Sequence, residues 1–205
     1  MEKERYLNDL KEIKEMMSRS SRFISLSGLS GISVGLIALA GAWAAWQSVY
    51  QNLDLSGYGK AQLSSASLTQ LLAIAGVTLL LSVALGIYFT TRETKKRNQK
   101  IWDHQTRRLL VNLAIPLLTG GILCLLLLLQ GLAGLMPALT LIFYGLALVN
   151  VSKYTLTELR SLGVLEIALG LAAAHFIAAG LLFWAIGFGL LQIIYGIVVP
   201  LKHKS

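Results

Sequence analysis

Glu166 is the residue whose chemical type and surroundings point most directly to a functional site. It lies in Gly-Val-Leu-Glu-Ile, residues 163–167, inside an otherwise apolar stretch. A carboxylate within a bilayer is costly, so such a group usually faces the bundle interior or a cavity and has a partner there. Residues three and four apart share a helix face, which places Glu166 on one side with Gly163 and Gly170. Three interpretations are open: a structural polar contact between helices, the handling of a proton or ligand, and a side chain that extends to the membrane interface.

Four polar residues are candidate partners of this carboxyl group. A tight turn expected near residues 179–182 brings Tyr195 on the following span to the depth of Glu166, and Gln192 one turn deeper. Asn112 and Tyr144 lie on neighbouring spans. We expect Glu166 to form a hydrogen bond with Tyr195 or Gln192, or else with Asn112 or Tyr144. These five residues form the candidate polar site.

Other chemistries find little support in the sequence. His175 lies nine residues beyond Glu166, which puts it on the opposite helix face and roughly 13 Å along the axis. Three histidines on different segments and a single cysteine, Cys124, do not make a metal site. The chain has no nucleotide-binding loop and no hydrolase or metalloprotease motif. The sequence therefore predicts a protein that is not an enzyme and that uses no metal or cofactor.

The composition is that of a membrane protein. The chain has 205 residues, of which 55% are hydrophobic and 14% are charged, whereas soluble domains carry about 25% charged residues. Six stretches approach the roughly 20 apolar residues that a spanning helix needs. We predict an all-α polytopic membrane protein with six transmembrane helices in three antiparallel hairpins. The spans are expected at 23–49, 68–91, 109–130, 133–151, 162–180 and 181–200, with a turn near Gln130–Gly134 between the third and fourth.

The basic residues predict how the chain is oriented. All but Lys60 of the 18 lysines and arginines fall before the first span, in the loops after the second and fourth, or after the sixth. Basic loops stay in the cytoplasm, so both termini are expected there. Residues 1–22 then form a cytoplasmic amphipathic helix, 23–200 the transmembrane domain and 201–205 a cytoplasmic tail. The short loops favour a bacterial inner membrane.

Three segments bear on partners other than the bilayer. The apolar stripe of helix 2–20 is expected to pack on the protein itself, with a second copy or another protein as the alternative. The basic loop 92–108 serves to fix orientation or to bind anionic lipid. The small-residue stripe that contains Gly28, Gly31 and Gly35 favours packing within the bundle over a dimer interface. The net charge of +8 reflects topology, and no nucleic-acid partner is expected.

Two functions remain open at this point. The first is a non-enzymatic membrane protein with an accessory, stress-response or assembly role. Such a protein would work either as a single copy or as an oligomer. The alternative is a small transporter or channel with a cytoplasm-facing polar cavity around Glu166. Polar residues gather in the cytoplasmic halves of the predicted spans, which either a cavity or a dry hydrogen-bond network would explain.

Overall fold

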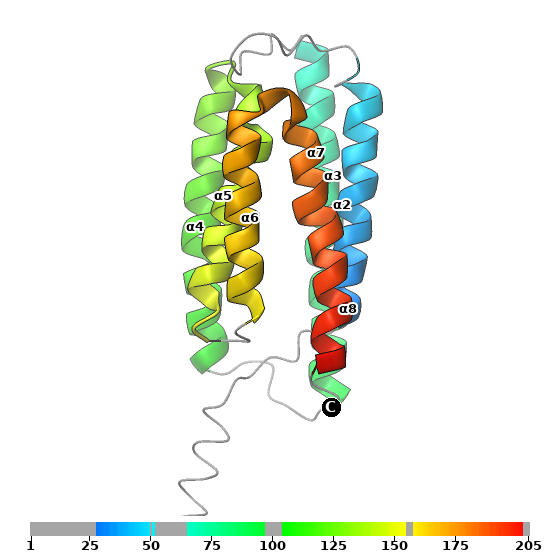
Figure 1. Ribbon diagram of the computed structural model, residues 1–205, viewed down its shortest axis with the longest axis vertical. Coiled ribbons are helices and arrows are strands. Elements are labelled where there is room, and N and C mark those ends of the chain that lie inside the picture. The colour runs from blue at the N-terminus through cyan, green and yellow to red at the C-terminus, as the bar shows by residue number, and fades with distance from the viewer. Residues whose placement is uncertain (1–27, 50, 52–64, 97–103, 155–157, 203–205) are drawn as a thin grey trace, which may run out of the picture.

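The computed structural model describes residues 28–49, 51, 65–96, 104–154 and 158–202. Throughout these residues the regular structure is helical, and the long helices run side by side along one axis (Figure 1). The predicted helix 2–20, the middle of the loop 92–108 (residues 97–103) and the end of the tail lie outside the described residues. The two ends of that predicted loop are helical, because the helix before it continues to Lys96 and the helix after it begins at His104.

Five long helices and a composite last helix follow one another in the described residues. Their bounds are α2 Gly28–Ser48, α3 Ser65–Lys96, α4 His104–Leu129, α5 Met136–Val151 and α6 Glu158–His175, followed by the last, composite helix. That helix comprises a 3₁₀ turn η3 Ile177–Ala179, α7 Gly180–Trp184, a π-helical segment η4 Ala185–Leu191 and α8 Gln192–Lys202.

Five helical stretches are long and apolar enough to cross a membrane. They are Gly28–Ser48, Ala66–Lys96, Thr106–Leu129, Ala133–Val151 and Ile177–Lys202. The chain is therefore all-α, with the composition and helix lengths of a multi-pass membrane protein. Helix α6 has 18 residues but carries Glu158 and Arg160 in its first turn and Glu166 near its middle. It runs the length of the bundle beside α5 (Figure 1).

The turn predicted near Gln130–Gly134 is present, and the backbone conformation of Gly131 explains it. Gly131 has φ of 77°, a left-handed conformation that only glycine adopts without strain. Its N–H bonds to the carbonyl of Leu128, and the N–H of Leu132 bonds to the carbonyl of Leu127. This pair of bonds is the Schellman arrangement that ends a helix and satisfies its last carbonyl groups.

The turn between the last two long helices comes earlier than the sequence suggested. Helix α6 ends at His175 and η3 begins at Ile177, so the chain reverses at Phe176 and not near residues 179–182. No glycine or proline marks this point. The reversal leaves 26 residues, Ile177–Lys202, for the last helix.

Glycines let the backbones of the central helices come into direct contact. A methyl group added at Gly145 of α5 would lie 2.5 Å from the carbonyl oxygen of Gly163 on α6. The stripe on α2 faces the last helix, where Gly31 meets the backbone of Gln192 and Gly196. Gly28 and Gly35 lie against the same helix, beside the carbonyl groups of Gly196 and Gly189. This stripe therefore packs within the bundle, as small-residue faces do in membrane helices.

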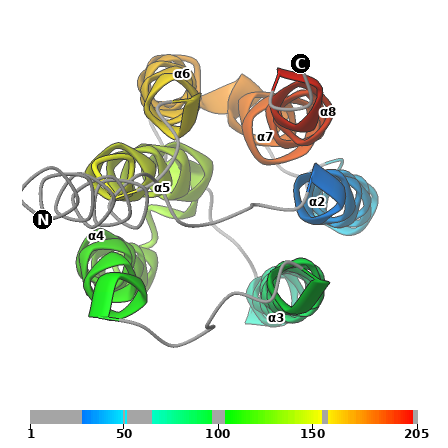
Figure 2. The same cartoon turned by 90° about the horizontal axis from the view of Figure 1, so that it is seen from below.

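The bundle is open on one side. Seen along the helix axes, α5 lies between α4 and α6, while α2 lies between α3 and the last helix (Figure 2). Helix α3 packs mainly on α2, and α4 mainly on α5, so α3 and α4 face outward at the two ends of this arc. Their side chains are largely exposed, including Leu80 at 70% and Leu118 at 65%. Such apolar faces fit contact with lipid chains.

Candidate functional site

The carboxyl group of Glu166 is completely buried. Its side chain is 0% exposed, and neither carboxylate oxygen has a hydrogen-bond partner among the described residues. The inward orientation follows from the helix pattern, because Leu162, Gly163, Gly170 and Ala173 on the same face of α6 are also buried. Buried polar groups are normally hydrogen-bonded. An unpartnered acid in the interior of a helical bundle therefore calls for a functional reason.

A glycine on the π-helical segment makes room for this acid. Gly187 lies directly against Oε2 of Glu166 and a methyl group of Leu141, so any side chain at this position would overlap both. Gly189, two residues later, faces Leu39, and its carbonyl oxygen lies beside Gly35 of α2. The segment thus packs on α6 with one side and on α2 with the other. Segments of π-helix occur often at functional sites.

A tyrosine–glutamine pair lies below the acid, toward the end of the bundle where α8 ends. Nε2 of Gln192 donates a 2.6 Å hydrogen bond to the hydroxyl oxygen of Tyr144. The ring of Tyr144 packs on Phe188, with a centroid distance of 4.9 Å. The pair therefore joins α5 to the last helix, and neither of its side chains forms a hydrogen bond with Glu166.

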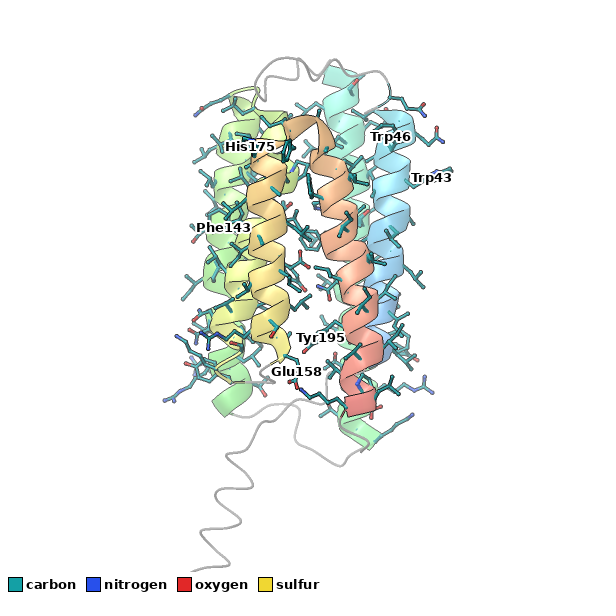
Figure 3. All side chains as sticks on the ribbon, viewed as in Figure 1. Trp43, Trp46, Phe143, Glu158, His175 and Tyr195 are labelled. Carbon is teal, nitrogen blue, oxygen red and sulfur yellow. The ribbon has the colours of Figure 1, made fainter. Side chains whose placement is uncertain are left out.

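Further polar groups continue toward the same end of the bundle. The hydroxyl oxygen of Tyr195 is buried and has no hydrogen-bond partner among the described residues. Tyr195 interacts electrostatically with Glu158, and both point into the space between α6 and α8 (Figure 3). Glu158 forms a 3.0 Å ion pair with Lys202, which links the lower ends of these two helices. A column of polar groups thus runs from this ion pair inward to Glu166.

A cavity adjoins this column. It has a volume of about 190 Å³ and is bordered by α2, α3, α5, α6 and α8. Its polar lining groups come from Ser30, Thr90, Tyr144, Gln192 and Tyr195. Glu166 is not among the lining residues, whereas Tyr144 and Gln192 are.

The structure brings together most, but not all, of the predicted polar site. Glu166, Tyr144, Gln192 and Tyr195 lie in one column. Asn112 lies elsewhere: its backbone and side-chain oxygens accept hydrogen bonds from Asn150 at 3.0 and 3.3 Å, joining α4 to α5.

The predicted hydrogen bond of Glu166 to one of its four candidate partners is wrong. Glu166 faces Gly187 instead, because the turn at Phe176 pairs α6 with a different part of the last helix. The role of Gly187 was not foreseen. The signal that was available is a pair of glycines, 187 and 189, inside an apolar stretch.

His175 is far from this column. It is the last residue of α6 and is exposed at the opposite end of the bundle, where its ring packs edge-on against Phe176 at 4.6 Å (Figure 3). Trp46 lies toward the same end on α2. Aromatic side chains prefer this depth at a membrane interface.

The site is defined by geometry alone. No family model, curated protein or solved structure matches the chain. Within the described ranges, no group of three or more His, Cys, Asp or Glu residues is placed to hold a metal ion. What remains is a sealed carboxyl group, together with Tyr144, Gln192 and Tyr195, which border a cavity that Glu166 does not line. A carboxyl group can accept hydrogen bonds when it is ionised and donate one when it is protonated.

Proposed function

We propose that the chain is a non-enzymatic, multi-pass protein of a bacterial inner membrane, and that it acts as a small transporter or channel with Glu166 as its working group. The observation that carries this proposal is the complete burial of Glu166 without a hydrogen-bond partner. Ionisable residues at such positions in membrane proteins commonly line ion or proton pathways.

A purely structural role for Glu166 is poorly supported. A polar contact that clamps two helices needs a donor on the second helix, and Glu166 faces the α-carbon of Gly187 and a leucine methyl group. Leaving a buried polar group unmatched costs about 1–3 kcal/mol, and more for a charged one. A glutamate kept at this cost is better explained by exchange of a ligand than by stability.

The orientation that we propose follows from the ends of the helices. The end of α3, the start of α4, the start of α6 and the end of α8 lie at one end of the bundle (Figure 1). The basic residues Arg92, Arg107, Arg108, Arg160 and Lys202 belong to these ends, which favours the cytoplasmic side. In this arrangement α6 is a further span, the fifth in chain order, and the last helix is the sixth. The cavity and the Glu158–Lys202 pair then lie toward the cytoplasm.

An accessory or assembly role without transport is the second candidate. It is favoured by the exposed apolar faces of α3 and α4, which no described helix covers. A second copy or another membrane protein would pack there, and anionic lipid would bind the basic end. In this case Glu166 would be dispensable for ion movement.

Flux measurements on reconstituted protein separate the two candidates. The full chain is placed in liposomes, and the movement of H⁺, Na⁺ and K⁺ under imposed gradients is followed with ion-sensitive dyes. We expect flux above that of empty liposomes, loss of that flux in Glu166→Gln, and normal flux in Glu93→Gln, which makes the same change on α3. Wild-type protein that moves none of the three ions would overturn the transport proposal.

A further inference from the structure

The bundle has two halves, and Glu166 lies where they meet: α4, α5 and α6 form the first half, and α2, α3, η4 and α8 form the second. We infer that loss of the proton from Glu166 separates the two halves at this contact, and that its return closes them again. This inference rests on the function proposed above, because it adds a means of regulation to the same carboxyl group. Three features carry it: the division of the bundle, the sealed acid, and the side-chain contacts that join the halves.

The division follows from how the helices pack on one another. Helix α5 lies between α4 and α6, and the backbones of α5 and α6 touch at Gly145 and Gly163. Helix α2 packs on α3, η4 and α8, and its Gly31 touches the backbone of Gly196. Figure 2 shows α4, α5 and α6 on one side of the bundle and α2, α3 and α8 on the other. Each half is therefore held together by contacts between backbones.

The last helix passes from one half to the other along its length. Its first part, α7, packs on α5 and α6, whereas η4 and α8 pack mainly on α2. The change of partner coincides with the change from α-helical to π-helical turns at Ala185. Beyond this point the halves meet mainly through side chains, such as Leu191 and Tyr195, which pack on a leucine cluster of α5 and α6. The junction of α7 and η4 is thus placed to act as a hinge.

The contacts below this hinge are of a kind that separates easily in a bilayer. Lipid chains are as apolar as leucine, so no hydrophobic effect holds the leucine cluster closed there. Polar contacts cross between the halves where Gln192 donates to Tyr144 at 2.6 Å and where Lys202 pairs with Glu158 at 3.0 Å. Hydrogen bonds between membrane helices are weak on average, and an ion pair with an exposed lysine contributes little.

The acid between the halves is kept protonated by its surroundings. Both oxygens of Glu166 are inaccessible and have no hydrogen-bond partner among the described residues. Gly187 of the second half lies directly against Oε2 and against a methyl group of Leu141. An isolated carboxylate in such a dry, apolar contact is so unfavourable that the group stays neutral instead. A proton fits this sealed space, because it adds to one oxygen and needs no other ligand.

The charges nearby do not offer Glu166 a partner in the closed arrangement. The described titratable side chains of α6 and of the elements that contact it are Tyr144, Glu158, Arg160, His175, Tyr195 and Lys202. None of them forms a hydrogen bond with Glu166. Of the two permanent cations, Arg160 precedes Glu166 by six residues, about 9 Å along the helix axis, and Lys202 pairs with Glu158. Ionisation of Glu166 therefore requires water.

Separation of the halves is what brings water to the carboxyl group. The cavity of about 190 Å³ lies between the halves, since Tyr144 and Leu148 line it from the first and Ser30 and Gln192 from the second. Movement of η4 and α8 away from α6 withdraws Gly187 from Oε2 and extends this space to Glu166. The closed form then holds one more proton than the open form, so acidic pH favours closing and alkaline pH favours opening.

Electron paramagnetic resonance measures this movement in the full chain in lipid. Spin labels are placed at Ser161→Cys on α6 and Val198→Cys on α8, both exposed positions below the hinge. Cys124→Ala is included because that cysteine is free. We expect the distance between the labels to grow by at least roughly 3 Å, the diameter of a water molecule, from acidic to alkaline pH. A pair above the hinge, Leu171→Cys on α6 and Leu182→Cys on α7, should keep its distance.

Glu166→Gln separates the effect of this acid from other effects of pH. The variant keeps the shape of the side chain but carries no charge, so we expect it to stay closed at every pH. Glu93→Gln, the same change on α3, should open as the wild type does. A wild-type distance that does not change with pH would overturn the inference. So would a change that persists unaltered in Glu166→Gln.

A second variant keeps the test valid if Glu166→Gln does not fold. The methyl group of Gly187→Ala would overlap Oε2 of Glu166 and Leu141, so the labels below the hinge should be farther apart than in the wild type even at acidic pH. Gly76→Ala on α3 is the matched control, because a methyl group there meets nothing within 4 Å. Folded Gly187→Ala with the wild-type distance at acidic pH would contradict the inference.

Failure of this inference and failure of the proposed function give different results. If Glu166→Gln abolishes ion flux while the wild-type distance does not respond to pH, transport stands and the separation of the halves is wrong. If the distances behave as expected but no ion moves across liposomes, the separation stands and transport is wrong.

Discussion

Replacing Gly145 by alanine is expected to destabilise the bundle through the backbone contact between α5 and α6. The added methyl group would lie 2.5 Å from the carbonyl oxygen of Gly163, and 2.7 and 2.9 Å from Cγ1 and the backbone nitrogen of Ile167. Two of these atoms belong to the backbone, so a side-chain rotation cannot relieve the overlap. An ordinary contact of 3.4 Å requires the helices to separate locally by about 0.9 Å, which is 3.4 minus 2.5.

The size of the effect follows from this separation. A gap of about 0.5–1 Å forfeits a quarter to a half of the dispersion attraction of each contact across the crossing. Overpacking of this kind costs about 1–3 kcal/mol, whereas alanine gains up to about 1 kcal/mol over glycine in a helix. Gly121→Ala on α4 is the matched control, because a methyl group there meets nothing within 4 Å.

Unfolding in mixed detergent micelles measures this difference. We expect Gly145→Ala to be less stable than Gly121→Ala by about 1–3 kcal/mol, since both gain helix propensity but only one loses packing. Indistinguishable unfolding curves for the two variants would refute the close approach of α5 and α6.

Substitutions at three other positions test separate features of the fold. Gly131→Ala is expected to lower the free energy of unfolding by about 1–2 kcal/mol, because its φ of 77° is left-handed, and Gly131→Asn should lose less in the same assay. Lys202→Gln breaks the ion pair with Glu158, in which the lysine side chain is 66% exposed. Unfolding at low and high salt should show a loss below about 1 kcal/mol that disappears at high salt. Asn150→Ala removes the hydrogen bonds to Asn112, and about 0.6 kcal/mol is expected from unfolding curves.

The lengths of the apolar stretches and the positions of glycines made much of the fold predictable. The fourth predicted span, 133–151, coincides with the helical stretch Ala133–Val151, because a glycine turn and a polar loop bound it. The inward orientation of Glu166 was also predictable, since helical spacing alone puts it on the face of Gly163 and Gly170.

The partner of Glu166 was not predictable, because it depends on where the chain reverses. In an antiparallel hairpin, moving the turn by a given number of residues moves each pairing by twice that number. A turn centred between 180 and 181 pairs residue 166 with 195, whereas a turn between Phe176 and Ile177 pairs it with 187. Residues 162–200 form one apolar run, and periodicity within such a run does not mark the turn.

The π-helical segment determines how the chain responds to changes in its length. A ladder of i→i+5 bonds holds one more residue than an i→i+4 turn of the same extent. Deleting one residue from Ala185–Leu191 would therefore restore α-helical turns and leave the remainder of the helix close to its present orientation. Gln192 would stay beside Tyr144, and Gly196 would stay against α2. The same deletion between Gln192 and Gly196, within the regular helix α8, would rotate everything after it by about 100° and turn Gly196 away from α2.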